Sequence, residues 1–338
     1  MEQLVDILVT TYNTNEQYLR QQIESILKQT HTNIQILISD DKSPDENVKK
    51  ILLEYAQKDK RIKLYIQTEN LGYNKNFEFL LNHSTADYIM FSDHDDIWYS
   101  DKVEKSLKKL IEENVDMVYC NCKQIDENGE ILQENYFKYK NVPLIDNKDK
   151  LSISRCVGIG CSQIITKAVR DKMIPFKEEV IAHDWLAAFI ASERKGIKYI
   201  EEPLFDYRLH NTNVFGGRSL QQNITKWKME NGKGYKSFAN YRKDVIKRAY
   251  ADGIKMCKQY ATDENDKLFI EKAEKYYEKI SGNKVIYLNI GTYCKILAGK
   301  NQFKKSIREV VLFHLPILAY VKFAITRVPK TKKERKEN

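Results

Sequence analysis

The stretch that decides the fold is Met90-Phe91-Ser92-Asp93-His94-Asp95-Asp96-Ile97-Trp98. Residues 86–91 are apolar apart from Asp87, which indicates a buried strand that ends where the carboxylates begin. Ligands of open α/β sheets bind at the carboxyl ends of the strands. An Asp-x-Asp spacing also places two hard oxygen donors on one side of a turn, which suits Mg²⁺ or Mn²⁺. The alternative is an acidic turn that caps a helix over about residues 100–113.

Strands and helices alternate on the N-terminal side of this stretch. The apolar or alternating runs at residues 4–9, 34–38 and 62–66 are typical of strands, and helical spacing of apolar residues separates them. One helix is predicted to begin with Ser43 as its N-cap, followed by Pro44 and by Glu46, which closes a capping box. Four strands that alternate with helices predict an α/β fold with a mostly parallel sheet.

The strand ends are polar, but they carry no glycine-rich phosphate loop. Neither Gly-x-Gly-x-x-Gly after the first strand nor Gly-x-x-x-x-Gly-Lys-Ser/Thr occurs, which argues against dinucleotide oxidoreductases and P-loop enzymes. We expect the ends of the first, second and fourth strands to face one crevice. There Tyr12 could stack on a nucleotide base while Thr10 and Asp41 bond its polar edge. Without further support, packing of Tyr12 against a loop and a turn role for Asp41 are the favoured alternatives.

Seven short motifs follow one another along residues 1–218. They are Thr10-Thr11-Tyr12-Asn13, Ser39-Asp40-Asp41-Lys42-Ser43, Asn70-Leu71-Gly72, Asp93-His94-Asp95-Asp96, Gly158-Ile159-Gly160-Cys161, Ala182-His183-Asp184-Trp185 and Tyr207-Arg208-Leu209-His210-Asn211-Thr212-Asn213. Together they resemble the family 2 glycosyltransferases, and the fourth and seventh look like the bacterial rhamnosyltransferase-like branch that builds cell-surface polysaccharides. The resemblance implies a GT-A fold, Rossmann-like with flanking helices, over residues 1–218.

The resemblance implies a role for each motif on the donor side. Nucleotide-sugar contacts fall on Thr10, Tyr12, Asp41, Asn70, Lys75, Asp93 and Arg208. Metal ligation falls principally on Asp95, with Asp93 and His210 as further ligands. A Mn²⁺ or Mg²⁺ ion held there would neutralise the charge that develops on the departing nucleotide diphosphate. Arg208 would offer its planar fork to phosphate oxygens.

On the acceptor side, inverting sugar transfer needs a base for the attacking hydroxyl, and Asp184 is the candidate. This chain has His183-Asp184 where many family members carry Glu-Asp. The residue next to the base is therefore different, and so is its influence on the pKa of the base. An alternative for Asp184 is binding to N–H groups at the start of a helix over residues 183–194. Acceptor contacts are assigned to Gly160, Cys161, His183 and Trp185, with a buried core position as the alternative for Cys161 and Trp185.

Positive charge is concentrated in the last third of the chain. Residues 219–338 contain 27 Lys and Arg against 12 Asp and Glu, and their apolar spacing is helical throughout. We therefore expect a separate, basic, all-helical C-terminal region. Its apolar segment 306–327 is too interrupted to span a membrane, but an interfacial helix with a polybasic tail fits an anionic membrane surface. A buried helix with a solvated tail is the alternative.

The leading hypothesis is a metal-dependent inverting glycosyltransferase with a lipid-linked or growing surface-glycan acceptor. Rhamnose from dTDP-rhamnose is the first choice of donor, and a UDP-hexose or UDP-N-acetylhexosamine is the alternative. The six cysteines and the lack of a secretory signal predict free thiols and a cytoplasmic protein, peripheral at the inner face of the cell membrane. A nucleic-acid-binding protein with an inactive crevice is the competing class, but no nucleic-acid motif is present. A homodimer is left open.

Overall fold

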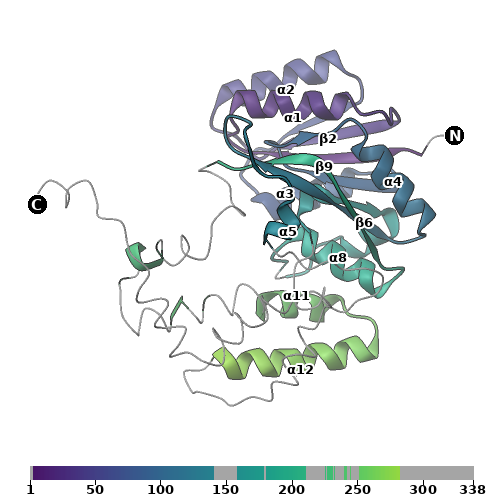
Figure 1. The fold of residues 1–338 in the computed structure, drawn as a ribbon, viewed down its shortest axis with the longest axis vertical. Helices are drawn as coiled ribbons and strands as arrows, with labels where there is room; N and C mark the ends of the chain where they lie inside the picture. Colours follow the sequence, from purple (N-terminus) through teal and green to yellow (C-terminus); the bar gives the residue numbers. More distant parts are fainter. Residues whose placement is uncertain are drawn as a thin grey trace, which may run out of the picture.

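In the computed structural model, residues 3–140, 158–178, 180–210 and 251–281 are described, with 225, 227–230, 232, 240–241 and 244 between the last two ranges. They form a nine-stranded mixed sheet between layers of helices, and a pair of further helices lies below the lower layer (Figure 1). The α/β class expected from the sequence is confirmed. The four cysteines of this part of the chain are free thiols.

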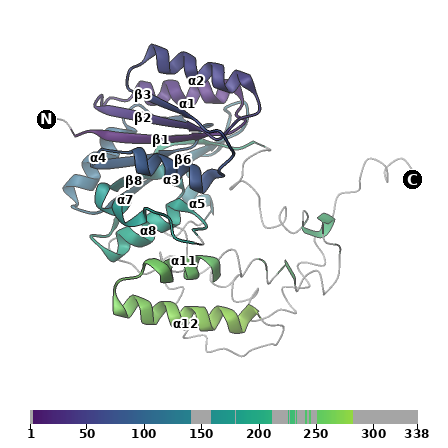
Figure 2. The ribbon, with the colours of Figure 1, turned by 180° about the vertical axis from the view of Figure 1, so that it is seen from behind.

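The parallel half of the sheet has the strand order β3-β2-β1-β4. Its strands are β1 (Val5–Thr11), β2 (Ile34–Asp40), β3 (Ile62–Ile66) and β4 (Tyr88–Ser92). The helices between them are α1 (Glu16–Leu27), α2 (Glu46–Lys58) and α3 (Tyr73–His83). Figure 2 shows α1 and α2 above the strands and α3 below them. Because both faces are covered, β1 is buried along its whole length.

The second half of the sheet continues from β4 in the order β8-β6-β9-β5. These strands are β8 (Gln163–Thr166), β6 (Met117–Ile125), β9 (Ile197–Arg208) and β5 (Ile97–Trp98), and β7 (Ile131–Gln133) pairs with β6. β8 is antiparallel to both β4 and β6, whereas β6 and β9 are parallel. The chain therefore crosses from the middle of the sheet to its far edge between β4 and β5. Residues 93–96, the Asp-rich turn, make that crossing.

The start of α2 differs from the prediction. The helix begins at Glu46, and its N-cap is Asp45, whose Oδ1 accepts the Asn47 N–H at 2.9 Å. Ser43 is engaged elsewhere, because its Oγ donates to Asp40 Oδ1 at 2.6 Å and accepts the Asn13 N–H at 2.8 Å. The serine thus joins the ends of β1 and β2 instead of capping the helix.

The acidic turn does not cap the next helix, which was the alternative function for its carboxylates. Strand β5 lies between the turn and α4 (Lys102–Glu112), and the N-cap of α4 is Asp101. The carboxylates of the Asp-rich turn are therefore not explained by the start of α4.

Two helices from the C-terminal third pack on each other, and one of them packs on the sheet-containing part of the chain. They are α11 (Asp252–Tyr260) and α12 (Glu264–Ser281), and α11 contacts α8 (His183–Glu193), as Figure 1 shows. A Cβ atom on Gly253 would lie 1.9 Å from Trp185 Cη2, so helix α11 approaches the indole as closely as glycine allows. At the other end of α11, the Tyr260 hydroxyl accepts the Lys177 N–H at 2.7 Å.

Helix α12 agrees with the helical spacing of apolar residues expected in residues 219–338. The predicted interfacial segment 306–327 and the polybasic tail lie outside the described residues. Within the described part of the chain, no helix has the length and apolar character needed to cross a membrane.

Replacing Gly253 by alanine should destabilise the protein by about 1–3 kcal/mol, because the new Cβ overlaps a buried indole. At an open helix position the same change stabilises by about 0.5–1 kcal/mol, so the sign of the effect is informative. Urea denaturation measures it. The control is Gly253→Ala in a Trp185→Leu background, where the smaller side chain leaves room and the cost should largely disappear. An equal cost in both backgrounds would show that the indole is not the cause.

Candidate active site

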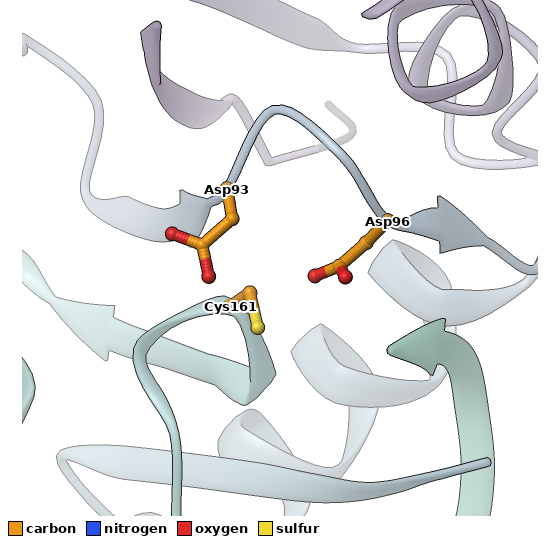
Figure 3. Close-up of side chains that lie close together, drawn as sticks. All are labelled: Asp93, Asp96 and Cys161. Atoms are coloured by element: carbon orange, nitrogen blue, oxygen red, sulfur yellow. The ribbon is translucent and has the colours of Figure 1, made fainter. Parts of the chain in front are cut away.

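The side chains of the Asp-rich turn point in two directions. Asp93 and Asp96 point toward Cys161, and one ligand atom from each of the three lies within 4.8 Å of the others (Figure 3). Asp95 instead meets His210 just beyond β9, with 2.7 Å between Oδ2 and Nε2. The crossing from β4 to β5 therefore divides three carboxylates between two small clusters.

Asp95 is the carboxylate that the surrounding charges keep ionised. Burial alone would raise its pKa, but His94, the hydrogen bond from His210 and the charge of Arg208 together lower that pKa below its ordinary value. Asp95 is 7% exposed, and the His210 ring packs beside Tyr18 with 5.6 Å between ring centroids. An ionised carboxylate next to an imidazole is a donor pair that fits Mn²⁺ or Mg²⁺.

The other two carboxyl groups are pushed toward their protonated forms. Burial and the nearby Asp95 raise the pKa of Asp93 to about 6, and the same causes raise the pKa of Asp96 well above its usual value. Asp96 is fully buried; its Oδ1 accepts the Arg208 N–H at 3.0 Å, and its Oδ2 has no hydrogen-bond partner among the described residues. Three aspartates in four residues therefore have three different environments.

Arg208 is placed differently from what the sequence suggested. Its guanidinium is buried, where Nε donates to the Asp95 carbonyl oxygen at 2.9 Å and Nη2 donates to Gln21 Oε1 at 2.7 Å. The guanidinium carbon also lies 4.3 Å from the centroid of the Tyr18 ring. In this arrangement the arginine does not present an open fork to a phosphate. It ties the Asp-rich turn to α1.

The predicted nucleotide contacts gather at the ends of β1 and β2. The Asp41 carboxylate accepts the N–H groups of Leu71 and Gly72 at 2.6 and 2.9 Å, and Asn70 Nδ2 donates to the Asp41 carbonyl oxygen at 3.1 Å. Asp41 thereby orders the Asn70-Leu71-Gly72 turn. Tyr12 is 49% exposed, which leaves much of its surface open to solvent.

Two further residues predicted to contact the nucleotide sugar, Thr10 and Lys75, lie beside the ends of β1 and β2. Thr10 is largely buried, and its carbonyl oxygen is 2.9 Å from His94 Nδ1, which links β1 to the Asp-rich turn. Lys75 is on the exposed side of α3, where its ammonium pairs with Glu78 at 2.6 Å.

The predicted acceptor residues meet where the short 3₁₀ helix η1 (Gly160–Ser162) touches the start of α8. A Cβ on Gly160 would lie 2.8 Å from His183 Nε2 and 3.6 Å from the Cβ of Asp184. His183 is buried beside Phe77, with 3.9 Å between ring centroids, and burial lowers its pKa to about 4. His183 is therefore a neutral imidazole at neutral pH.

Asp184 is partly exposed in the first turn of α8. It lies near enough to Asp93 that its negative charge raises the pKa of Asp93 further. Its Oδ1 accepts the N–H of the next residue at 2.8 Å, so the helix-start contact considered in the sequence is present. One oxygen accepting that N–H retains capacity for a further bond, and the second oxygen is a separate acceptor. The helix-start contact and the base are thus compatible.

Trp185 does not form the expected acceptor platform. The residue is 4% exposed, and its indole packs against Gly253 of α11. Cys161, 1% exposed, is likewise buried. For both side chains the core alternative describes their position, although the backbone around Cys161 still lines the junction between η1 and the Asp-rich turn.

Sequence reasoning missed three residues that support this site. Tyr18 and Gln21 are three apart on α1, so both could have been placed on one face of that helix. Lys102 is completely buried, and nothing in its polar surroundings along the sequence signals this. Only the arrangement of β5, β9 and η1 around the start of α4 encloses it.

Comparisons with known proteins identify the family of this chain. The sequence pattern of the family described as Glycosyl transferase family 2 matches residues 6–173. An uncharacterized glycosyltransferase of Methanocaldococcus jannaschii is 32% identical over 238 residues, which cover 67% of this chain and 80% of that protein. The dTDP-rhamnosyl transferase RfbG of Shigella flexneri is 30% identical over 264 residues, covering 72% of this chain and 84% of RfbG.

A solved structure has the same fold. S. aureus TarS 1-349, in complex with UDP-GlcNAc, matches 95% of this chain with a TM-score of 0.52, and 81% of the TarS chain is covered. The sequence identity of 15% makes this a similarity of fold alone. With relatives at 30% identity or more over most of their length, the chain belongs to glycosyl transferase family 2 and is a glycosyltransferase.

Proposed function

We propose that this glycosyltransferase is a metal-dependent, inverting enzyme that moves a sugar from a nucleoside diphosphate donor to a glycan acceptor. The observation that carries the proposal is the contact of 2.7 Å between Asp95 and His210 at the carboxyl edge of the sheet, with Asp184 close enough to influence Asp93. A carboxylate base suits the attack of an acceptor hydroxyl with inversion, and a metal-binding pair suits the departure of a nucleoside diphosphate.

The donor is held, in this proposal, by the cluster at the ends of β1 and β2. Tyr12 offers an exposed ring for stacking on the base, and the ordered Asp41–Asn70 contact offers polar groups at its edge. Thr10 and Lys75 border this surface. We propose dTDP-rhamnose as the first donor, since RfbG is a dTDP-rhamnosyl transferase, and a UDP-hexose or UDP-N-acetylhexosamine as the second.

Mn²⁺ or Mg²⁺ would be held by Asp95 and His210. Asp93, whose side chain points toward Cys161, would complete the ligand set only after turning toward this pair. Such an ion, when bound, neutralises the charge that develops on the departing diphosphate. Arg208 supports metal binding indirectly, because its hydrogen bonds to the Asp95 carbonyl and to Gln21 hold the Asp-rich turn in place. The diphosphate contact that the sequence suggested for Arg208 is therefore replaced by a positioning role.

Asp184 accepts the proton of the acceptor hydroxyl while that oxygen bonds to the anomeric carbon and the bond to the diphosphate breaks on the opposite face. Its neighbour His183 is neutral, so it neither competes for the proton nor repels a cation at the Asp-rich turn. The acceptor that we propose is a lipid-linked or growing surface glycan. Residues 219–338 would bring the enzyme to an anionic membrane surface at the inner face of the cell membrane.

A ligand screen separates this proposal from nucleic-acid binding. Thermal unfolding is followed with dTDP-rhamnose, UDP-glucose or UDP-N-acetylglucosamine, each with and without Mn²⁺, and binding of DNA and RNA oligonucleotides is measured at physiological salt. We expect a rise in the melting temperature with at least one donor, larger when Mn²⁺ is present. Salt-resistant oligonucleotide binding without a donor response would reject the enzymatic crevice.

Replacing Asp95 by asparagine should weaken Mn²⁺ binding and metal-dependent release of nucleoside diphosphate by roughly 10²-fold or more. The change removes the ionised ligand while the polar contact with His210 can persist. Isothermal titration with Mn²⁺ and a nucleoside diphosphate assay measure the two effects. The control is Asp101→Asn, an aspartate six residues later whose partner is Lys105 on the surface of α4. If Asp95→Asn keeps the Mn²⁺ response of Asp101→Asn, the metal is bound elsewhere.

Replacing Asp184 by asparagine should lower the rate of transfer by roughly 10²-fold or more and leave donor affinity unchanged. The asparagine oxygen can still accept the Trp185 N–H, so stability should fall by no more than about 1 kcal/mol. Both quantities are measured on one preparation, with Asp171→Asn on an exposed part of α7 (Lys167–Met173) as the control. Near-normal turnover in a stable, donor-binding variant would leave Asp184 with only its role at the helix start.

A further inference from the structure

The position of Lys102 is unfavourable for its own helix. The lysine is the first residue of α4 and is 0% exposed. A cation at the N-terminus of a helix faces the positive end of the helix dipole, and its burial adds a cost of desolvation. Burial correspondingly lowers the pKa of Lys102, against the opposing effect of nearby groups that include Cys120, Cys161 and Asp96. Contacts with other elements of the fold must therefore offset the cost of burying this lysine.

Two aromatic rings and one carbonyl group surround the Lys102 ammonium. Nζ lies 3.7 Å from the centroid of the Trp98 ring and 4.0 Å from that of the Phe205 ring, distances at which cation–π attraction offsets part of the lost hydration. Nζ donates to the Cys161 carbonyl oxygen at 2.6 Å. Among the described residues this is its one hydrogen-bond acceptor. The ammonium therefore joins β5, β9 and η1.

The segment whose carbonyl Lys102 holds contacts both sides of the proposed reaction. Cys161 Sγ is within 4.8 Å of ligand atoms of Asp93 and Asp96, as Figure 3 shows. Gly160, the preceding residue, fits against His183 and Asp184 with no room for a Cβ. Trp98, which flanks the ammonium, ends the strand that follows the Asp-rich turn. A displacement of η1 would thus change the position of α8 relative to that turn.

A second cation site at Asp93, Asp96 and Cys161 is the competing interpretation of this cluster. Burial raises the pKa of the Cys161 thiol and of the Asp96 carboxyl, which disfavours the ionised forms that a cation would need. The Lys102 ammonium, bound to the carbonyl of the same cysteine, would also repel a second cation. We therefore interpret the Asp93–Asp96–Cys161 cluster through its contact with Lys102 and not as a cation site.

We propose that Lys102 is a positioning residue for sugar transfer: by holding the Cys161 carbonyl it sets the separation between the Asp-rich turn and Asp184. This inference rests on the proposed function, in which the turn binds the donor side and Asp184 receives the acceptor proton. The Asp95–His210 contact is secured independently by Arg208. Loss of the Lys102 ammonium should therefore affect transfer without affecting metal or donor binding.

The test replaces Lys102 by methionine, which keeps the length and apolar contacts of the side chain but removes the ammonium. The control is Lys105→Met, a lysine on the same helix whose ammonium binds Asp101 and Glu202 at the surface. Mn²⁺ and dTDP affinity are measured by calorimetry. Transfer is measured from dTDP-rhamnose or UDP-glucose to a synthetic N-acetylhexosamine-diphosphate-alkyl acceptor. Amide hydrogen exchange of residues 158–163 is followed with no ligand present.

We expect Lys102→Met to lower kcat by roughly 10-fold or more, with Mn²⁺ and dTDP affinity within about twofold of wild type, because small misplacements of reacting groups are costly. Exchange over residues 158–163 should become faster than in Lys105→Met. Unchanged kcat or unchanged exchange would overturn the proposal. Equal losses of dTDP affinity and kcat would also overturn it, since the lysine would then support the site as a whole.

Misfolding of the variant and inactivity of the wild-type protein have separate consequences for the proposal. If Lys102→Met does not fold, Lys102→Met with Asp96→Asn is compared with Asp96→Asn alone, which keeps an oxygen for the Arg208 N–H, and the same measurements apply. If the wild-type protein binds no nucleotide and transfers no sugar, the proposed function fails. Hydrogen exchange then still decides whether Lys102 holds the Cys161 segment, and unchanged exchange rejects that as well.

Discussion

The buried guanidinium of Arg208 is the contact on which the site depends. One side chain bonds the carbonyl of Asp95, the amide of Gln21 and the face of Tyr18, while its own backbone N–H binds Asp96. It thereby joins the end of β9, the crossing between β4 and β5, and the first helix. An arginine can do this because its planar group presents several donors in fixed directions, whereas a lysine could satisfy only part of this set.

Much of the fold follows from the sequence because its signals are local. Apolar runs with periods of two and 3.6 residues mark β1 to β4 and their helices, and the carboxylates after β4 lie at the sheet edge as expected. The positions that differed depend on competition between distant groups. Asp40 takes the hydroxyl of Ser43, which could otherwise have capped α2. The burial of Arg208, Trp185 and Lys102 depends on elements that pair only in the folded chain.

Crowded carboxylates explain the electrostatic character of the site. Asp93, Asp95 and Asp96 are close together in a buried region, where three negative charges would be strongly unfavourable. The chain separates them: imidazole and guanidinium groups keep Asp95 ionised, while burial raises the pKa of its two neighbours. One ionised carboxylate beside another whose pKa is near 6 spares the turn three simultaneous negative charges.

The contact between Trp185 and Gly253 joins regions that the sequence treats as separate. Trp185 immediately follows Asp184, so the indole that packs on α11 and the carboxylate that faces the Asp-rich turn belong to the same turn of α8. Helix α11 thus supports the position of α8 and is not a detachable appendage. Residue 218, where the motifs end, is consequently a poor place to truncate the chain for expression, because the shortened protein would expose the surface of α8 that α11 covers.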